Sequence, residues 1–362
     1  WIASAGEETW GGETTAIVRE PDADWITSPV VGRFGPSLEP AIFIVSRGGV
    51  LRAYDWAGAP VAIDDDSTPS TIQLRGGDKA SLMVVDAAAA PGQMLIALSS
   101  EADSVFLCVL GCGATWPGTG WVERGIDGIE MPLCAGKLAS TPALGLMSEP
   151  SAGIDIRGAY FASFEAAALR FHFLPLPGST GSGELLTSAP VATTAPPGLF
   201  EISTGDIDGD GFDEAVAAIP GWGLCYYEYS NGWRRVLLRG SAPSAPILCD
   251  VDGDGTLETA LRDDSHLYLL SGFGVPATGW PQAIDPGVAE AYRYVPAVPP
   301  IAGDIDDDGR IEVLFRVGGD MRAFGFEGRE ARLWPLPGEG ASGGSLALIA
   351  SDRGTQYIID CA

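Results

Sequence analysis

Positive charge is scarce in this chain. Among its 362 residues, 21 are lysine or arginine and 48 are aspartate or glutamate, which gives a formal net charge of −27. Only Lys79 and Lys137 are lysines. A protein that binds nucleic acid needs a basic face to meet the phosphates and release their counterions. The composition therefore predicts that nucleic acid is not a partner.

Long apolar runs are also lacking. No segment approaches the roughly 18 consecutive apolar residues of a membrane-spanning helix, so we expect no membrane span in this chain. The sequence begins at Trp1, with neither an initiator methionine nor a signal-peptide pattern. We expect a mature exported chain or an excised ectodomain, located outside the cell or on its surface.

Histidine and cysteine are few. His172 and His266 each lie in a strand-like pattern beside large apolar residues, so we expect packed or rim residues rather than catalytic bases. The six cysteines form no CxxC pair and no Cys/His cluster, which argues against zinc, haem and dithiol redox chemistry. Two alternatives stay open for them: buried thiols, or disulfides such as Cys225–Cys249 in an exported protein.

Acidic residues, by contrast, recur in a fixed pattern. Asp-x-Asp-x-Asp-Gly-x-x-Glu occurs three times in the second half of the chain, each time after a short apolar stretch. The copies run from Asp206 to Glu214, from Asp250 to Glu258 and from Asp304 to Glu312. Like charges at alternate positions repel one another unless a cation lies between them. Three copies of the full pattern therefore predict Ca²⁺ binding, with about three ions per chain.

The expected ligands follow from the spacing. Positions 1, 3, 5 and 9 would give carboxylate oxygens, position 7 a backbone carbonyl, and the glycine at position 6 permits the sharp turn. The predicted metal ligands are Asp206, Asp208, Asp210, Phe212, Glu214, Asp250, Asp252, Asp254, Thr256, Glu258, Asp304, Asp306, Asp308, Arg310 and Glu312. No catalytic residue and no organic cofactor is predicted.

These loops do not have the sequence of EF-hands. An EF-hand needs a bidentate glutamate at position 12 and a helix on each side. Position 12 here is Ala217, Leu261 or Phe315, and short apolar or β-rich runs closed by Pro, Gly or Asp flank the loops. The pattern therefore predicts a strand, a calcium turn and a second strand.

A strand, a DxDxDG turn and a strand, repeated at this spacing, resemble the FG-GAP repeats (integrin-α-like, VCBS-type) of calcium-binding β-propellers. The motifs that carry the resemblance begin at Gly205, Cys249 and Gly303, and they cover about a third of the chain. In that family the loops brace the blades, and the binding surface lies elsewhere. The family usually has Asp at position 9, whereas Glu is present here, so this ligand is expected to reach further or to bind in a bidentate manner.

A second repeat extends the prediction to the whole chain. A short amphipathic strand followed by a turn recurs at steps of 35 to 63 residues, which is typical of propeller blades with about four strands each. We predict an all-β fold: a single β-propeller over residues 1–362, with seven blades, although six or eight are also compatible. The blades would span approximately residues 24–62, 79–120, 138–178, 199–240, 245–284, 297–338, and 343–362 with 10–20. The N-terminal strand would complete the last blade and close the ring.

The favoured function is that of a non-catalytic binding or structural module. Calcium loops, acidic charge and a ring-forming repeat are typical of cell-surface adhesion or of an extracellular assembly, with a protein or a glycan as partner. The alternative is a polysaccharide-binding lectin or a polysaccharide lyase on the same calcium-braced scaffold. Trp10, Trp25, Trp56 and Trp222 are candidate exposed aromatics, although core packing is the expected role for most of them.

Overall fold

The computed structural model describes most of the chain in separate stretches. They are residues 9–10, 13–14, 26–27, 29–33, 40–61, 71–76, 79–86, 93–110, 131–149, 154–176, 185–192, 198–228, 232–286, 298–305, 308–332, 334–337, 345–350 and 356–361. The chain divides into two compact units, described separately below: residues 1–144 with 148–199, and residues 145–147 with 200–362.

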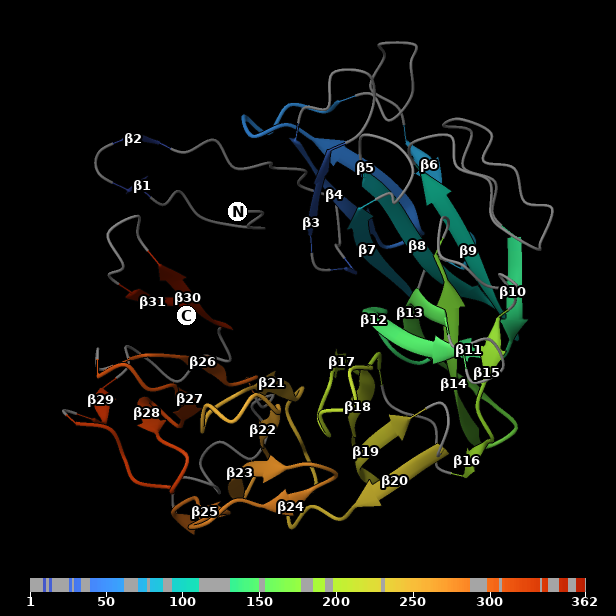
Figure 1. The fold of residues 1–362 in the computed structure, drawn as a ribbon. Helices are drawn as coiled ribbons and strands as arrows, with labels where there is room; N and C mark the ends of the chain where they lie inside the picture. Colours follow the sequence, from blue (N-terminus) through green and yellow to red (C-terminus); the bar gives the residue numbers. More distant parts are fainter. Residues whose placement is uncertain are drawn as a thin grey trace. The chain divides into compact units, whose positions relative to one another are not determined.

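The first unit contains three larger antiparallel sheets (Figure 1). Their strand orders are β3-β4-β5-β6, then β10-β9-β8-β7, then β11-β13-β14-β15, where β12 also pairs with β13 and β16 with β14. The bounds are β3 (Val30–Arg33), β4 (Pro40–Ser46), β5 (Val50–Tyr54), β6 (Ile72–Gln73), β7 (Ala80–Asp86), β8 (Gln93–Glu101), β9 (Ser104–Leu110), β10 (Met131–Ala135), β11 (Lys137–Leu138), β12 (Ala143–Glu149), β13 (Ile154–Glu165), β14 (Ala168–Pro175), β15 (Leu186–Thr187) and β16 (Val191–Ala192). Two short strands, β1 (Thr9–Trp10) and β2 (Glu13–Thr14), pair with each other.

The second unit contains three more antiparallel sheets and one strand pair (Figure 1). Their orders are β17-β18-β19-β20, then β21-β22-β23-β24 with β25 also on β23, then β26-β27-β28-β29, and finally β30-β31. The bounds are β17 (Ile202–Gly205), β18 (Glu214–Ile219), β19 (Gly223–Glu228), β20 (Gly232–Val236), β21 (Ile247–Cys249), β22 (Glu258–Arg262), β23 (His266–Ser271), β24 (Val275–Pro276), β25 (Gln282–Ala283), β26 (Ile301–Gly303), β27 (Glu312–Val317), β28 (Asp320–Phe324), β29 (Leu336–Pro337), β30 (Ser345–Ala350) and β31 (Gln356–Cys361).

Within each unit, consecutive sheets pack against each other through buried apolar side chains. In the first unit one cluster joins β3–β6 to β7–β10, and another joins β7–β10 to β11–β16. In the second unit Tyr226 and Leu270 belong to the cluster between the first two sheets, and Leu269 and Phe315 to the next one. Burial of apolar area between the sheets is the main force that holds them together.

The second strand of each sheet in the second unit is buried along its whole length. Every residue of β18, β22 and β27 is buried, because a neighbouring strand lies on each side and packed side chains cover the faces. This explains why the sequences after the acidic loops read as continuous apolar runs rather than as alternating ones.

The all-β prediction is confirmed, whereas seven blades and ring closure stay predictions. In the described part of the chain, β1 and β2 pair only with each other, and residues 15–19 of the predicted closing strand lie outside the described residues. No helix among the described residues has both the length and the hydropathy needed to cross a membrane.

The disulfide alternative is wrong for Cys225 and Cys249, since neither residue is in a disulfide. Cys225 lies on β19, the third strand of its sheet, and Cys249 lies on β21, the first strand of the next sheet. Burial raises the pKa of both thiols to about 12. Cys108 and Cys134 are not in disulfides either; Cys108 and Cys225 are buried, whereas Cys134 and Cys249 are half-buried.

His172 is a core residue of the first unit. Its ring is only 2% exposed and stacks on Phe161 at a centroid distance of 4.7 Å. Its Nε2 lies 2.9 Å from the Ser163 hydroxyl and its Nδ1 lies 3.0 Å from the Thr187 hydroxyl. Both ring nitrogens therefore have neutral hydroxyl partners. Burial, and then the charge of Arg170, lower the pKa of His172 to about 4.

Acid should destabilise the sheet around His172. The folded-state pKa of about 4 lies below the ordinary value of 6.5, so the unfolded chain takes up the proton first as pH falls. The stabilisation is complete above pH 6.5 and is lost toward pH 4, at up to about 1.4 kcal/mol per pH unit. Urea unfolding followed by circular dichroism across this window measures the loss.

Two histidine variants make this test specific. In His172→Gln the titrating ring is gone, so the stability difference between wild type and variant should shrink as pH falls. His266→Gln is the matched control and should keep the wild-type dependence. An unchanged pH dependence in His172→Gln would contradict the prediction.

Candidate metal centre

Each acidic loop joins the first two strands of a sheet in the second unit. The three hairpins have the same register, because Gly205 pairs with Glu214, Cys249 with Glu258 and Gly303 with Glu312. Eight loop residues therefore lie between the closing pairs in every case. The predicted strand, turn and strand is confirmed, and the position-12 residues Ala217, Leu261 and Phe315 lie buried in the second strand.

The first aspartate of each loop organises its backbone. Asp206 accepts hydrogen bonds from the backbone N–H groups of Gly209, Asp210 and Gly211, at 2.7, 3.1 and 2.8 Å. Asp250 accepts the equivalent three bonds at 2.7, 3.1 and 3.0 Å. In the third loop, Asp304 accepts bonds from Asp308 and Gly309, both at 3.0 Å.

The glycine at position 6 adopts a backbone conformation that other residues rarely reach. Its φ is +91° at Gly211, +91° at Gly255 and +85° at Gly309. A side chain there would be strained even though a Cβ atom would meet nothing within 4 Å. The glycine is therefore required by the turn and not by packing.

The loops bring their aspartates together. Side-chain oxygens of Asp206, Asp208 and Asp210 lie within 4.8 Å of one another, and so do those of Asp250, Asp252 and Asp254. In both triads the first aspartate is half-buried and the other two are exposed. Such clusters could hold metal ions such as Ca²⁺, which prefers oxygen ligands. In the third loop, Asp306 lies outside the described residues.

The glutamate at position 9 is the buried member of each loop. Glu214, Glu258 and Glu312 are the first residues of β18, β22 and β27, and their exposed fractions are 0%, 1% and 4%. In each, Oε2 accepts a hydrogen bond from the N–H of loop position 2, which is Ile207, Val251 or Ile305, at 2.9–3.0 Å. One carboxylate oxygen therefore holds the start of its own loop.

The other oxygen of Glu214 provides the test for a metal. Glu214 Oε1 is buried and has no hydrogen-bond partner, and an unpaired buried carboxylate oxygen is costly. Burial, and then the charges of Asp208 and Asp210, raise the pKa of Glu214 to about 8. The same causes, with Asp252 and Asp254 as the nearby charges, raise the pKa of Glu258 to about 7. An all-oxygen set that repels its own charge fits a hard cation such as Ca²⁺.

The residue at position 7 of each loop is held by a hydrogen bond from its backbone N–H group. The backbone N–H groups of Phe212, Thr256 and Arg310 donate to the aspartate at position 5 of the same loop, at 2.8–3.0 Å. These bonds fix the residues beside the carboxylates. Ligation by their carbonyl oxygens stays a prediction.

Sequence reasoning missed one residue of the first loop. Asp213, at position 8, donates its backbone N–H to the Leu146 carbonyl at 2.7 Å, and its Oδ2 accepts the Leu146 N–H at 2.7 Å. The equivalent residues in the other loops are Leu257 and Ile311. An acid at a position that is otherwise apolar was the available signal.

The candidate aromatics are only partly surface residues. Trp56 is 63% exposed, whereas Trp222 is only 8% exposed and contacts Trp233 and Arg235. Trp25 lies outside the described residues, and so does the side chain of Trp10. Expected core packing is therefore found for Trp222 and not for Trp56.

Comparison with known proteins adds no relative. No protein-family model matches the chain, and no curated protein shows significant sequence similarity to it. The FG-GAP resemblance therefore rests on the three loops themselves.

A substitution that removes the charge of Glu214 should show whether this residue is a metal ligand or only a structural residue. Glu214→Gln keeps an oxygen for the Ile207 N–H and removes the buried charge. Without calcium the variant should be at least as stable as wild type, because burial disfavours the ionised form of Glu214 in the wild-type protein. With calcium it should be less stable, since calcium binds at least tenfold more weakly, or about 1.4 kcal/mol at that site.

Thermal unfolding in calcium and in chelator measures both effects. Glu101→Gln, at the exposed end of β8, is the matched control and should shift neither curve. A Glu214→Gln protein that gains as much stability from calcium as wild type does would contradict the assignment.

Proposed function

We propose that this chain is an extracellular calcium-binding β-propeller of FG-GAP type that serves as a non-catalytic binding module. The observation that carries the proposal is the loop geometry: clustered aspartate oxygens beside a buried glutamate with an unpaired oxygen. Three loops with one register support three calcium ions, held by residues 206–214, 250–258 and 304–312.

The position of the loops supports a bracing role. Each loop lies between the first strand and the fully buried second strand of its sheet. A cation bound there would hold the loop against the first residue of the second strand, and it would reduce the repulsion among the carboxylates. Calcium binding would then add to folding stability.

The exposure of the aspartates supports an extracellular setting. Two of the three aspartates in each described triad are exposed, so water reaches the ion. Open sites of this kind are typical of extracellular modules, which work at roughly millimolar calcium. The net charge of −27 favours a protein partner or a glycan over nucleic acid.

Calcium removal tests the proposal directly. The melting temperature should rise with added Ca²⁺, because an ion at about 100 times its Kd stabilises the folded state by about 2.7 kcal/mol per site. Mg²⁺ at the same concentration should give a smaller rise, since it demands a tighter octahedral geometry. Differential scanning calorimetry with elemental analysis measures stability and stoichiometry together.

Loop variants make the stoichiometry informative. Asp208→Asn and Asp252→Asn should each remove about one bound ion. Asp55→Asn is the matched control, because Asp55 also accepts backbone N–H groups in a turn but belongs to no acidic loop. A protein that contains no calcium and melts identically in calcium and chelator would overturn the proposal.

A further inference from the structure

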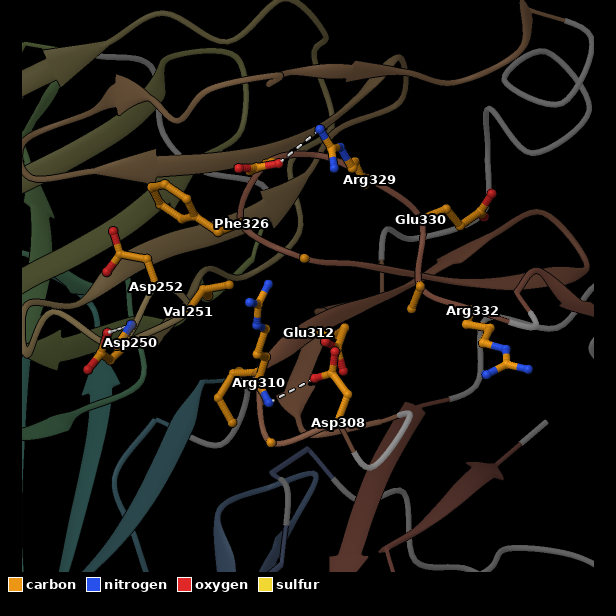
Figure 2. Close-up of a pocket in the computed structure, with 16 residues that line it drawn as sticks. Asp250, Val251, Asp252, Asp308, Arg310, Glu312, Phe326, Arg329, Glu330 and Arg332 are labelled. Atoms are coloured by element: carbon orange, nitrogen blue, oxygen red, sulfur yellow. Dashed lines mark hydrogen bonds and ion pairs between the residues drawn. The ribbon is translucent and has the colours of Figure 1, made fainter.

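A groove of about 580 Å³ lies beside the second and third acidic loops (Figure 2). Residues 250–253 line it from the second loop and residues 308–312 from the third. Residues 325–327 and 329–332, in the turn after β28, form the rest of the wall. All of these residues belong to the second unit. The volume is within the usual range for small-molecule sites, about 300–1,000 Å³.

Two of the acids that line the groove are already paired. Glu330 accepts two hydrogen bonds from Arg322, from Nε at 2.7 Å and from Nη2 at 3.2 Å. Glu327 forms an ion pair with Arg329 at 3.3 Å. Both pairs are close to neutral, so they do not decide the charge of the groove.

The remaining acids belong to the loops, and two further arginines line the groove. Asp250, Asp252, Asp308 and Glu312 are predicted calcium ligands. Arg310 and Arg332 also line the groove, and no described residue forms an ion pair with either guanidinium. Calcium in both loops would offset four of the eight loop carboxylate charges, and so weaken the repulsion that an anionic ligand would meet beside these two arginines.

Arg310 has the more central position. Figure 2 shows its side chain extending toward Val251 and Phe326, in the middle of the lining residues. A guanidinium presents planar paired donors that match a carboxylate in bidentate geometry. The groove therefore has a donor suited to a carboxylate in an otherwise acidic protein.

The other residues that line the groove restrict the class of ligand further. Glu327 and Glu330 keep acceptor oxygens that hydroxyl groups can use, and Phe326 offers an apolar face. A ligand that carries a carboxylate, several hydroxyl donors and an apolar ring face is an acidic sugar. We infer that the groove binds a uronic-acid oligosaccharide when the two loops hold calcium, with the sugar carboxylate on Arg310. This inference rests on the calcium binding proposed above.

Titration calorimetry on the full chain tests the inference. The probe is a galacturonic acid trimer, and its methyl ester is the neutral control of the same size. The calcium-loaded protein should bind the acid at least tenfold more tightly than the ester. The calcium-free protein should bind the acid at least tenfold more weakly than the loaded protein does.

Variants then locate the site. Arg310→Gln should lower the affinity for the trimer at least tenfold, and Arg310→Lys should restore part of it. Arg332→Gln should lower it less. Arg234→Gln is the matched control: this exposed arginine lies over Phe273 and does not line the groove, so its loss should leave trimer binding unchanged. Calcium stoichiometry is measured on every variant, and only calcium-loaded proteins are compared.

The outcomes separate this inference from the proposed function. A protein that binds calcium but not the trimer overturns the groove assignment and leaves the calcium function standing. Equal trimer binding with and without calcium overturns the charge argument. A triglutamate peptide that binds as tightly as the trimer shows that the groove recognises charge alone, and overturns the assignment to sugar. A protein that binds no calcium overturns both proposals.

Discussion

The hydrogen bond from the second loop residue to the buried glutamate at position 9 is the constraint on which the acidic loops depend. It ties the start of each loop to the first residue of the central strand. Since that strand is buried along its whole length, the glutamate carboxylate must also be buried. The fold therefore places negative charge in its interior, beside exposed aspartates that repel it.

This arrangement favours a bound cation beside each buried glutamate. A buried carboxylate is tolerated when it is neutralised by a proton or a counterion. The raised pKa values of Glu214 and Glu258 express the first solution, and calcium would provide the second. The same ions would also set the charge of the neighbouring groove, so bracing and recognition would share one cause.

The acidic loops were predictable because their chemistry is local. Gly211, Gly255 and Gly309 supply the turn, and the spacing of the aspartates fixes the hairpin register. The groove was not predictable, because it joins a calcium loop of one sheet to a turn of the next. The choice between thiols and a Cys225–Cys249 disulfide could not be made for a similar reason: it depends on how strands of two different sheets are placed.

The two hydrogen bonds between Asp213 and Leu146 have a consequence for the order in which parts of the protein fold during synthesis. The two residues are 67 positions apart, so Leu146 leaves the ribosome well before its partner. Until Asp213 arrives, the Leu146 backbone lacks both of these partners. Because closing a chain of this length carries an entropic cost, the contact should form late, when the first acidic loop folds. Folding of that loop would then fix the backbone around Leu146, which is synthesised well before the loop.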